Sequence, residues 1–318
     1  MRVLPAAAVV LAAASIASAA GADRTVTSPG PVRALARSGF SVAFLSGPYA
    51  GHCGPHVELW SLVTRGVYRL GRHTDALCRE APSTGSGIAD IAVAGNRALW
   101  LEYAGGNLRD WVLQTATTTR PQERELEFQE VDVDAPPPIV LGVASEQVLP
   151  YSTGSTVKVL KANGARAYRW QAPARVTNTT AYGAMVAAFV VGGRCFVLSP
   201  TGTVRQTYAF APGSVQEFAL AGVGLVVQLA GGRIEIRRGA ALIRRLRLPS
   251  GARMLDYAEG ILLYKLGAQI RARRASTGRD RLLRRATYAV LEHNGLSYAV
   301  GRRVSSVAMV NVQAALGR

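Results

Sequence analysis

The sequence contains few lysines, histidines and cysteines, and these shortages bear on its function. Lysine occurs only at Lys158, Lys161 and Lys265, so arginine supplies nearly all of the formal net charge of +17. Such a charge is typical of proteins that bind nucleic acid, anionic membranes or acidic polymers. A chain rich in Ala, Gly and Arg but poor in Lys is also what a high-GC genome encodes. We favour this compositional origin of the charge over a dedicated polyanion site.

The local motifs of common enzyme classes are also absent. There is no nucleophile elbow, phosphate-binding loop or HExxH helix. With only four histidines, few places remain where a Ser-His-Asp triad could be built. The sequence therefore favours a non-catalytic protein, and we expect no cofactor.

Long stretches with the 3.6-residue period of an amphipathic helix are missing as well. The chain has 318 residues, 49% of them hydrophobic, which is enough to bury a large core, and it contains 33 glycines. Short apolar or β-branched runs alternate instead with turn residues. The pattern predicts an all-β protein.

Residues 215–251 are the cleanest copy of a unit that recurs along the chain. The unit reads as four short strands, QEFALAG, GLVVQLA, RIEIRR and LIRRLRLP, separated by tight turns that contain Gly or Pro. Four strands in about forty residues are typical of one blade of a β-propeller.

The second strand of the unit can be followed through seven copies. They begin at Val42, Ala98, Gln147, Ala187, Gly224, Gly260 and Gly295. Successive copies start closer together toward the C-terminus, so insertions concentrate in the first two or three units. A third strand follows each copy, the last of them predicted at residues 306–312. The sequence therefore predicts seven blades, each a four-stranded antiparallel sheet.

The seventh unit ends without room for a complete outer strand. A closed ring must still pair its edges, and residues 24–27, ahead of the turn Ser28-Pro29-Gly30-Pro31, could supply the missing strand. The alternative is a disordered N-terminus and a frayed C-terminal end.

These repeats, with a small-residue turn between the first and second strands and a Gly-rich turn between the second and third, resemble the TolB-like and quinoprotein-like β-propellers. The resemblance covers about residues 32–312 and is architectural. The chain lacks the Gly-His and Trp-Asp pairs of WD-repeat proteins and the aligned Trp motif of quinoprotein blades. No functional residue can be carried over from these families.

The first twenty residues have the features of a secretory signal. Met1-Arg2 is followed by an apolar run from Val3 to Ile16 and by the cleavage pattern Ala17-Ser18-Ala19. The run is shorter than the ~20 residues of a membrane-spanning helix. We expect residues 1–20 to be removed, residues 21–318 to form one propeller domain without a membrane span, and the protein to be secreted or located in the cell envelope.

The cysteines suggest one disulfide. Cys53 and Cys78 lie in long connections that emerge on the same face of a propeller. An exported chain passes through an oxidising compartment, and a bridge closing this loop would contribute roughly 3 kcal/mol. Cys195 lies within a strand and is predicted to be a buried thiol. A zinc site made from His52, Cys53, His56, His73 and Cys78 is the less favoured alternative, because the spacing matches no closed zinc module.

Four carboxylates lie in or near the predicted first strands, which line the central channel of a propeller. They are Asp90, Glu217, Asp256 and Glu292. Calcium-dependent propeller hydrolases place acidic ligands there, so a hydrolase or lyase with a metal at the channel is the alternative function. Because the offsets of the four residues from the following turn differ, we favour ordinary rim carboxylates and expect no metal.

The long connections of blades one to three all belong to the loop classes that share one face. Binding residues tend to lie on loops held by a rigid frame. We predict a contact surface over these blades, comprising Tyr49, His52, Asn107, Arg109, Asp132 and Asp134. The leading hypothesis is a monomeric binding or scaffold module whose partner is a protein or an anionic envelope polymer, without specific nucleic-acid binding.

Overall fold

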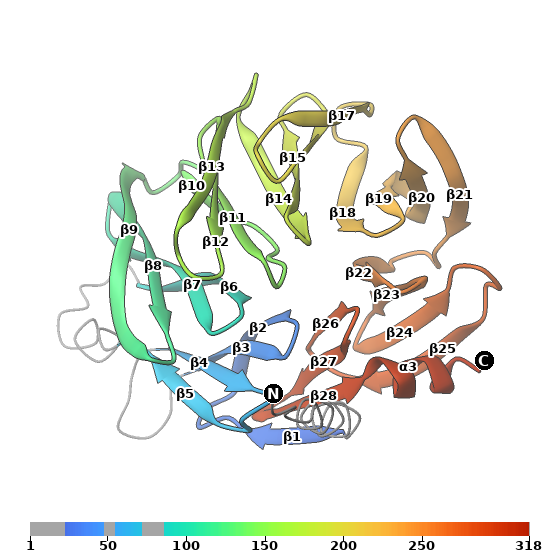
Figure 1. Cartoon of the computed structure of the whole chain (residues 1–318), viewed down its shortest axis with the longest axis horizontal. Helices are drawn as coiled ribbons and strands as arrows, with labels where there is room; N and C mark the ends of the chain where they lie inside the picture. Colours follow the sequence, from blue (N-terminus) through green and yellow to red (C-terminus); the bar gives the residue numbers. More distant parts are fainter. Residues whose placement is uncertain (1–22, 48–54, 72–85, 318) are drawn as a thin grey trace, which may run out of the picture.

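The described strands form a closed ring of seven four-stranded sheets around a central channel (Figure 1). The structure is a computed structural model and describes residues 23–47, 55–71 and 86–317. Every pairing within the sheets is antiparallel, and first strands such as β2, β14, β18 and β26 lie beside the channel. The seven-bladed propeller predicted from the repeats is confirmed.

Blade two contains the longest strands of the first three blades. Their bounds are β2 (Val32–Ser38), β3 (Ser41–Ser46), β4 (His56–Ser61) and β5 (Val67–Leu70) in blade one; β6 (Gly87–Ala94), β7 (Arg97–Gly105), β8 (Leu108–Thr117) and β9 (Arg120–Asp132) in blade two; and β10 (Ile139–Leu141), β11 (Val148–Thr153), β12 (Thr156–Lys161) and β13 (Arg166–Gln171) in blade three.

Blades four to six are more regular and have shorter connections. They consist of β14 (Val176–Tyr182), β15 (Met185–Val190), β16 (Arg194–Leu198) and β17 (Val204–Ala209); β18 (Val215–Ala221), β19 (Gly224–Leu229), β20 (Arg233–Arg238) and β21 (Ala241–Arg247); and β22 (Arg253–Ala258), β23 (Ile261–Leu266), β24 (Gln269–Arg274) and β25 (Asp280–Arg285). A single 3₁₀ turn, η1 (Ala230–Gly232), joins β19 to β20.

Blade seven is assembled from both ends of the described chain. Strands β26 (Tyr288–Glu292), β27 (Gly295–Val300) and β28 (Arg303–Ala308) are completed by β1 (Arg24–Thr27), which pairs with β28. The predicted closure of the ring by residues 24–27 is therefore confirmed.

The last predicted strand was placed too far toward the C-terminus. Residues 306–312 were expected to be a third strand, but β28 ends at Ala308 and α3 (Met309–Ala315) follows it. Met309, Val312 and Leu316 recur at helical spacing and are buried against the core between blades six and seven. Because β1 already occupies the outer position, the chain after β28 has no sheet edge left to join.

Two of the second strands, β19 and β27, begin with a glycine. Gly224 and Gly295 have φ of +121° and +148°. A Cβ at either position would lie 2.1 Å from the carbonyl oxygen of the neighbouring strand, Arg237 or Val307. Any side chain would therefore disturb the start of the second strand where it pairs with the third strand.

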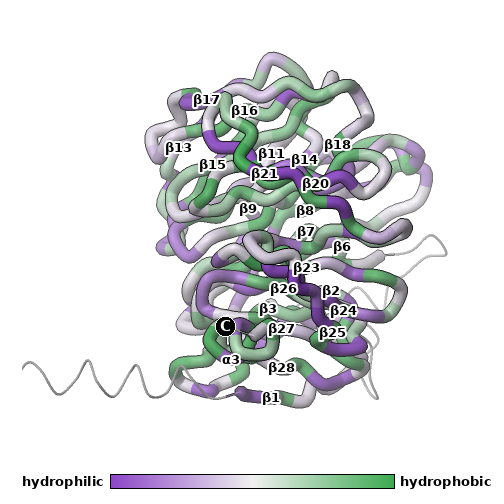
Figure 2. The backbone as a smooth tube through the Cα atoms, turned by 90° about the vertical axis from the view of Figure 1, so that its right-hand side faces the viewer, coloured by the Kyte–Doolittle hydropathy of each residue, from purple (hydrophilic) through white to green (hydrophobic). Residues whose placement is uncertain are grey.

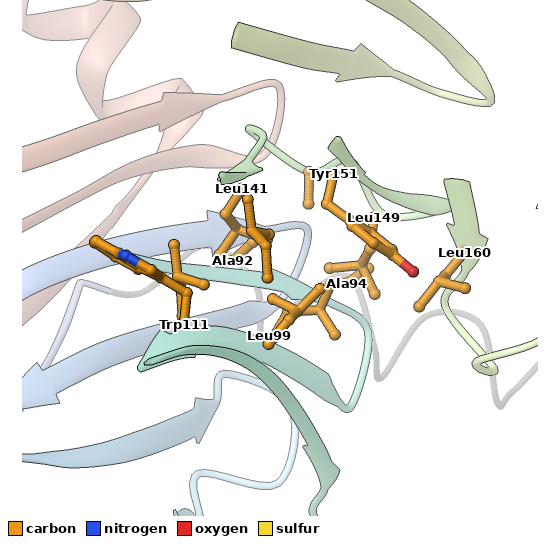
Figure 3. Packing of buried hydrophobic residues seen from close by; sticks show 12 residues of the cluster. Ala92, Ala94, Leu99, Trp111, Leu141, Leu149, Tyr151 and Leu160 are labelled. Atoms are coloured by element: carbon orange, nitrogen blue, oxygen red, sulfur yellow. The ribbon is translucent and has the colours of Figure 1, made fainter. Parts of the chain in front are cut away.

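Apolar side chains fill the spaces between neighbouring blades. Between blades two and three, Leu99 and Leu149 are fully buried in a cluster that also contains Ala92, Ala94 and Trp111 (Figure 3). The second strands of the blades, such as β3 and β15, are buried along nearly their whole length, because both faces of each sheet pack against a neighbouring blade. No described helix is both long and apolar enough to span a bilayer.

Candidate binding surfaces and central channel

Blade two projects farther than its neighbours at one end. Strands β7, β8 and β9 have 9, 10 and 13 residues, whereas the other described strands have three to eight. The hairpin between β7 and β8 and the segment after β9 form the end of this projection. We call residues 105–109 together with residues 128–134 the blade-two tip.

The tip brings together four of the residues predicted to bind a partner. In the register of β8 and β9, Leu108 faces Asp132 and Arg109 faces Val131. The backbone N–H of Val133 donates to the carbonyl of Asn107 at 3.0 Å, which ties the segment after β9 to the hairpin. Asn107, Arg109, Asp132 and Asp134 therefore lie at one end of blade two, with the Arg109 and Asp132 side chains on opposite faces of the sheet.

The Arg109 side chain is held in place by aromatic rings. Its guanidinium carbon lies 5.1 Å from the centre of the Tyr103 ring, which in turn lies 5.4 Å from the ring of Trp111. Cation–π contacts of this kind favour one orientation of the arginine. The backbone N–H of Asp134 donates to the Asp132 carboxylate at 3.0 Å and fixes the turn after β9.

Three large apolar side chains are exposed on or beside this tip. Leu108, Phe128 and Val133 are 54%, 50% and 36% exposed. Their exposure was not predicted, because the sequence pattern of a strand does not reveal which face is left uncovered when a blade extends past its neighbours. The length of the charged run in β9 was the available signal.

Several sequence-predicted residues lie outside the described part of the chain. Tyr49, His52, Cys53, His73 and Cys78 belong to this group, so the proposed disulfide and the alternative zinc site stay predictions. His56 is described: it is buried in β4, and its ring lies within hydrogen-bonding distance of the Arg69 guanidinium, with 2.7 Å between Nδ1 and the nearest guanidinium nitrogen.

The first-strand carboxylates fall into two groups. Asp90 and Asp256 line one cavity of the channel, about 230 Å³ in volume. Asp256 and Glu292 line a second cavity, about 380 Å³, at one mouth of the channel. Glu217 is elsewhere: it forms an ion pair with Arg253 beside a hollow between blades five and six.

The surrounding strands hinder hydration of the channel carboxyls. Desolvation raises the pKa of Asp90 to about 6 although the Ile91 N–H donates to it at 2.8 Å, and raises the pKa of Asp256 to about 7. Burial likewise raises the pKa of Glu292 to about 7, opposed by the hydrogen bond from the Gly39 N–H. These groups change charge near neutral pH.

One cluster at the channel mouth was not foreseen. Glu146, Glu292 and His293 have potential ligand atoms within 4.8 Å of one another. Glu146 Oε1 lies 3.5 Å from His293 Nε2 and accepts a hydrogen bond of 2.8 Å from the Asn294 amide. Glu146 lies in the turn between β10 and β11, and the other residues lie in or beside β26, so only ring closure brings them together.

The cluster lies beside a buried cation. Arg37, 4% exposed, lines the same cavity and donates to the hydroxyls of Ser297 and Ser306 at 3.1 and 3.0 Å. Burial lowers the pKa of Arg37 to about 10, while Glu292 and Glu146 act in the opposite direction. Glu292 and Glu146 therefore lie close enough to this buried cation to act on its charge.

Cys195 does not supply a reactive thiol. It is a free cysteine, fully buried in β16, and burial raises the pKa of its thiol. Its raised pKa keeps it protonated at neutral pH, where a thiol is a weak nucleophile. The prediction of a buried thiol is confirmed.

Comparisons with known proteins identify the fold. No protein-family model and no curated protein matches the sequence. The structure is similar to a chain in the crystal structure of the mitotic checkpoint complex, with a TM-score of 0.57, 12% identity and coverage of 90% of this chain and 94% of that chain. It is also similar to the WD40 β-propeller domain of Doa1, with a TM-score of 0.53, 13% identity and coverage of 89% and 95%. At this identity the likeness shows the propeller fold alone, and the TolB-like or quinoprotein-like assignment is not confirmed.

Proposed function

We propose that this protein is an exported, non-catalytic binding module that holds a protein partner at the blade-two tip. The observation that carries the proposal is the length of β7, β8 and β9, along whose end Leu108, Phe128 and Val133 are exposed, the first two on the same face of the sheet. Exposed apolar side chains grouped on a rigid element are typical of protein-interaction sites.

The charges around these side chains indicate the chemistry of the partner. Glu125, Glu130, Asp132 and Asp134 are exposed along β9 and the turn that follows it. This acidic border contrasts with the net charge of +17 of the whole chain. A partner with an apolar patch flanked by Lys or Arg would complement the tip, because opposite charges steer association and fix the register of an interface.

The tip is stiff before any partner binds. The bond from Val133 to Asn107 and the stacking of Arg109 on Tyr103 restrain the hairpin, and Pro136, Pro137 and Pro138 fix the backbone after Asp134. Restraint in the free state lowers the entropy lost on binding.

The export part of the proposal is supported by the sequence of residues 1–20, with its basic start, apolar run and Ala17-Ser18-Ala19 pattern. N-terminal sequencing of the protein recovered from the source cell's envelope and culture medium tests it. A first residue at position 20 or 21 is expected, and recovery of the protein only from the cytosol, with Met1 intact, contradicts export.

Affinity capture from the envelope fraction, compared between matched variants by quantitative mass spectrometry, tests the tip. We expect Leu108→Ser combined with Phe128→Ser to reduce capture of the partner at least tenfold. The control is Val204→Ser combined with Val300→Ser, two side chains that are 41% and 48% exposed on blades four and seven. Equal capture by the tip variant and the wild type, at unchanged melting temperature, contradicts the proposal.

A further inference from the structure

The charge of the protein is distributed very unevenly around the ring. Residues 215–286, which form blades five and six, contain 15 Arg and Lys against 5 Asp and Glu, a net charge of +10. Residues 87–134, which contain blade two, have 4 Arg against 9 Asp and Glu, a net charge of −5. A uniform compositional bias toward arginine does not produce opposite signs in two parts of one ring.

The outer strands of blades five and six repeat the same short sequence. Strand β21 contains Leu242-Ile243-Arg244-Arg245, and β25 contains Leu282-Leu283-Arg284-Arg285. The two copies occupy equivalent places, because both ladders have a bulge directly after the first leucine and then pair the first arginine with an isoleucine of the third strand.

Both copies lie on the outside of the ring. Strands β21 and β25 are the last strands of their sheets. In Figure 2, which faces this side, the chain around β20, β21, β24 and β25 is strongly hydrophilic. Leu242, Ile243 and Leu282 are nevertheless 37%, 54% and 47% exposed among the arginines.

Hydrogen bonds join the two blades into one surface. Arg244 donates to the carbonyls of Ala275 and Ser276 in blade six, the latter at 2.9 Å. In return, Arg273 of β24 donates to the carbonyl of Arg247 at 2.7 Å. We call the exposed side chains of β21 and β25 the basic flank.

Few acids neutralise this flank. Glu235 lies between Arg233, Arg237 and Arg245, and Asp280 pairs with Arg271. Within the described parts of the chain, no carboxylate lies within ion-pair distance of Arg247, Arg281 or Arg285, all of which are exposed. Their charges are available to an anionic partner.

We infer that the basic flank is a docking surface for an anionic phospholipid bilayer. Guanidinium groups bind phosphates through paired hydrogen bonds, and each basic residue near an anionic bilayer contributes about a fivefold increase in binding. The exposed Leu242, Ile243 and Leu282 decide for a bilayer over a soluble polyanion, because aliphatic side chains enter the interfacial region of lipid but gain nothing from a hydrated polymer.

Nucleic acid fits the flank less well. Binding to single strands uses aromatic platforms, whereas the large hydrophobic side chains exposed among the described residues of blades five and six are aliphatic. The acidic blade-two tip lies on another part of the ring. If the basic flank docks on a membrane, the tip therefore stays free to bind a protein. The inference does not depend on that proposed function.

Vesicle co-sedimentation tests the inference. Binding to phosphatidylcholine vesicles that contain phosphatidylglycerol is compared with binding to vesicles of phosphatidylcholine alone. The measured quantity is the ratio of the two affinities, because any contribution of the apolar residues 3–16 is the same for both vesicles and cancels. The wild type should prefer the anionic vesicles, and the preference should fall steeply as salt is added. Equal binding to both vesicles overturns the inference.

Two sets of variants locate the surface. Replacing Arg247, Arg281 and Arg285 by Gln should lower anionic-vesicle binding by about a hundredfold, taking about fivefold for each arginine. The control replaces Arg120, Arg166 and Arg169 by Gln, which removes the same charge from the outer strands of blades two and three. An equal loss in the control shows that net charge alone acts and overturns the inference.

Ile243→Ser combined with Leu282→Ser separates lipid from other polyanions. This variant should lose about tenfold in vesicle binding while keeping its affinity for soluble dextran sulfate, with Val204→Ser and Val300→Ser as the control. Unchanged vesicle binding by the variant would mean that the arginines recognise any polyanion, and the bilayer assignment would fail.

Discussion

The hydroxyl of Thr25 lies 3.0 Å from the hydroxyl of Ser305, although 280 residues separate the two. They are register partners in β1 and β28, and they are flanked by the pairs Arg24–Ser306, Val26–Val304 and Thr27–Arg303. The propeller is thus closed by hydrogen bonds between its first and last strands. Without β1, the outer edge of β28 would be open.

Removing β1 should therefore destabilise the whole ring. A chain that begins at Ser28 loses four residue pairs, and at about 1 kcal/mol for each the loss is roughly 4 kcal/mol. The melting temperature measured by circular dichroism should fall clearly below that of a control chain beginning at Gly21, which keeps β1. Coinciding melting curves for the two chains would show that the closure contributes nothing.

Much of the fold follows from local sequence. Short apolar runs bounded by glycine turns identify the strands, because a position such as Gly224 admits no side chain and so marks where one strand ends and the next begins. The helix α3 was not predicted, since Met309 and Val312 fit a strand as well as a helix in so short a run. The choice between strand and helix depends on the pairing of β1 with the outer edge of β28, which joins residues far apart in the sequence.

The attachment of blade two to blade three offers a second test. Glu127 of β9 forms an ion pair with Lys158 at 2.5 Å and accepts a hydrogen bond from Tyr151 at 3.1 Å. Because both partners of the ion pair are largely buried, Glu127→Gln should lower the free energy of unfolding by about 1 kcal/mol, measured by urea titration. The exposed Glu125 on the same strand is the control, and Glu125→Gln should change stability little. The same small change in both variants would show that the contacts of Glu127 with Lys158 and Tyr151 add no measurable stability.

Thiol counting tests the cysteine assignments. Cys195 is buried and its pKa is raised, so the native protein should not react with a thiol reagent. After denaturation without reductant, one thiol should react if Cys53 and Cys78 form the predicted disulfide, and three should react after reduction. Three thiols without reductant would refute the disulfide, and two would mean that the pairing is wrong.

Contacts within one blade could be predicted from the sequence, whereas contacts between distant blades could not. Asn107, Arg109, Asp132 and Asp134 lie at one end of blade two because β8 and β9 are adjoining strands, a relationship that strand order alone provides. Glu146 and His293 meet across the channel mouth, between blades three and seven. No local pattern encodes that contact, since it depends on the number of blades and on which turns reach inward.

Stability should depend on pH through the carboxyls of the channel. Desolvation raises the pKa of Asp256 to about 7, well above the 3.8 of an unperturbed aspartate. Between about pH 4 and pH 7 the folded protein therefore binds more protons at this group than the unfolded chain does. The contribution of Asp256 to the free energy of unfolding should therefore be fully present near pH 4 and should fall as the pH rises to about 7. Above about pH 7 it should no longer change with pH.

Asp256→Asn tests this dependence directly, because it removes the ionisation while keeping an oxygen that can accept the 2.8 Å hydrogen bond from the Tyr257 N–H. At about pH 8 the variant should be more stable than the wild type by up to a few kcal/mol, and at about pH 4 the two should be alike. Thermal melts across this range measure the difference. Glu259→Gln is the matched control, since Glu259 is exposed at the same channel mouth and should give a melting temperature parallel to that of the wild type at every pH. If Asp256→Asn also runs parallel to the wild type, Asp256 ionises in the folded protein at its ordinary pKa, and the channel does not withhold water from it.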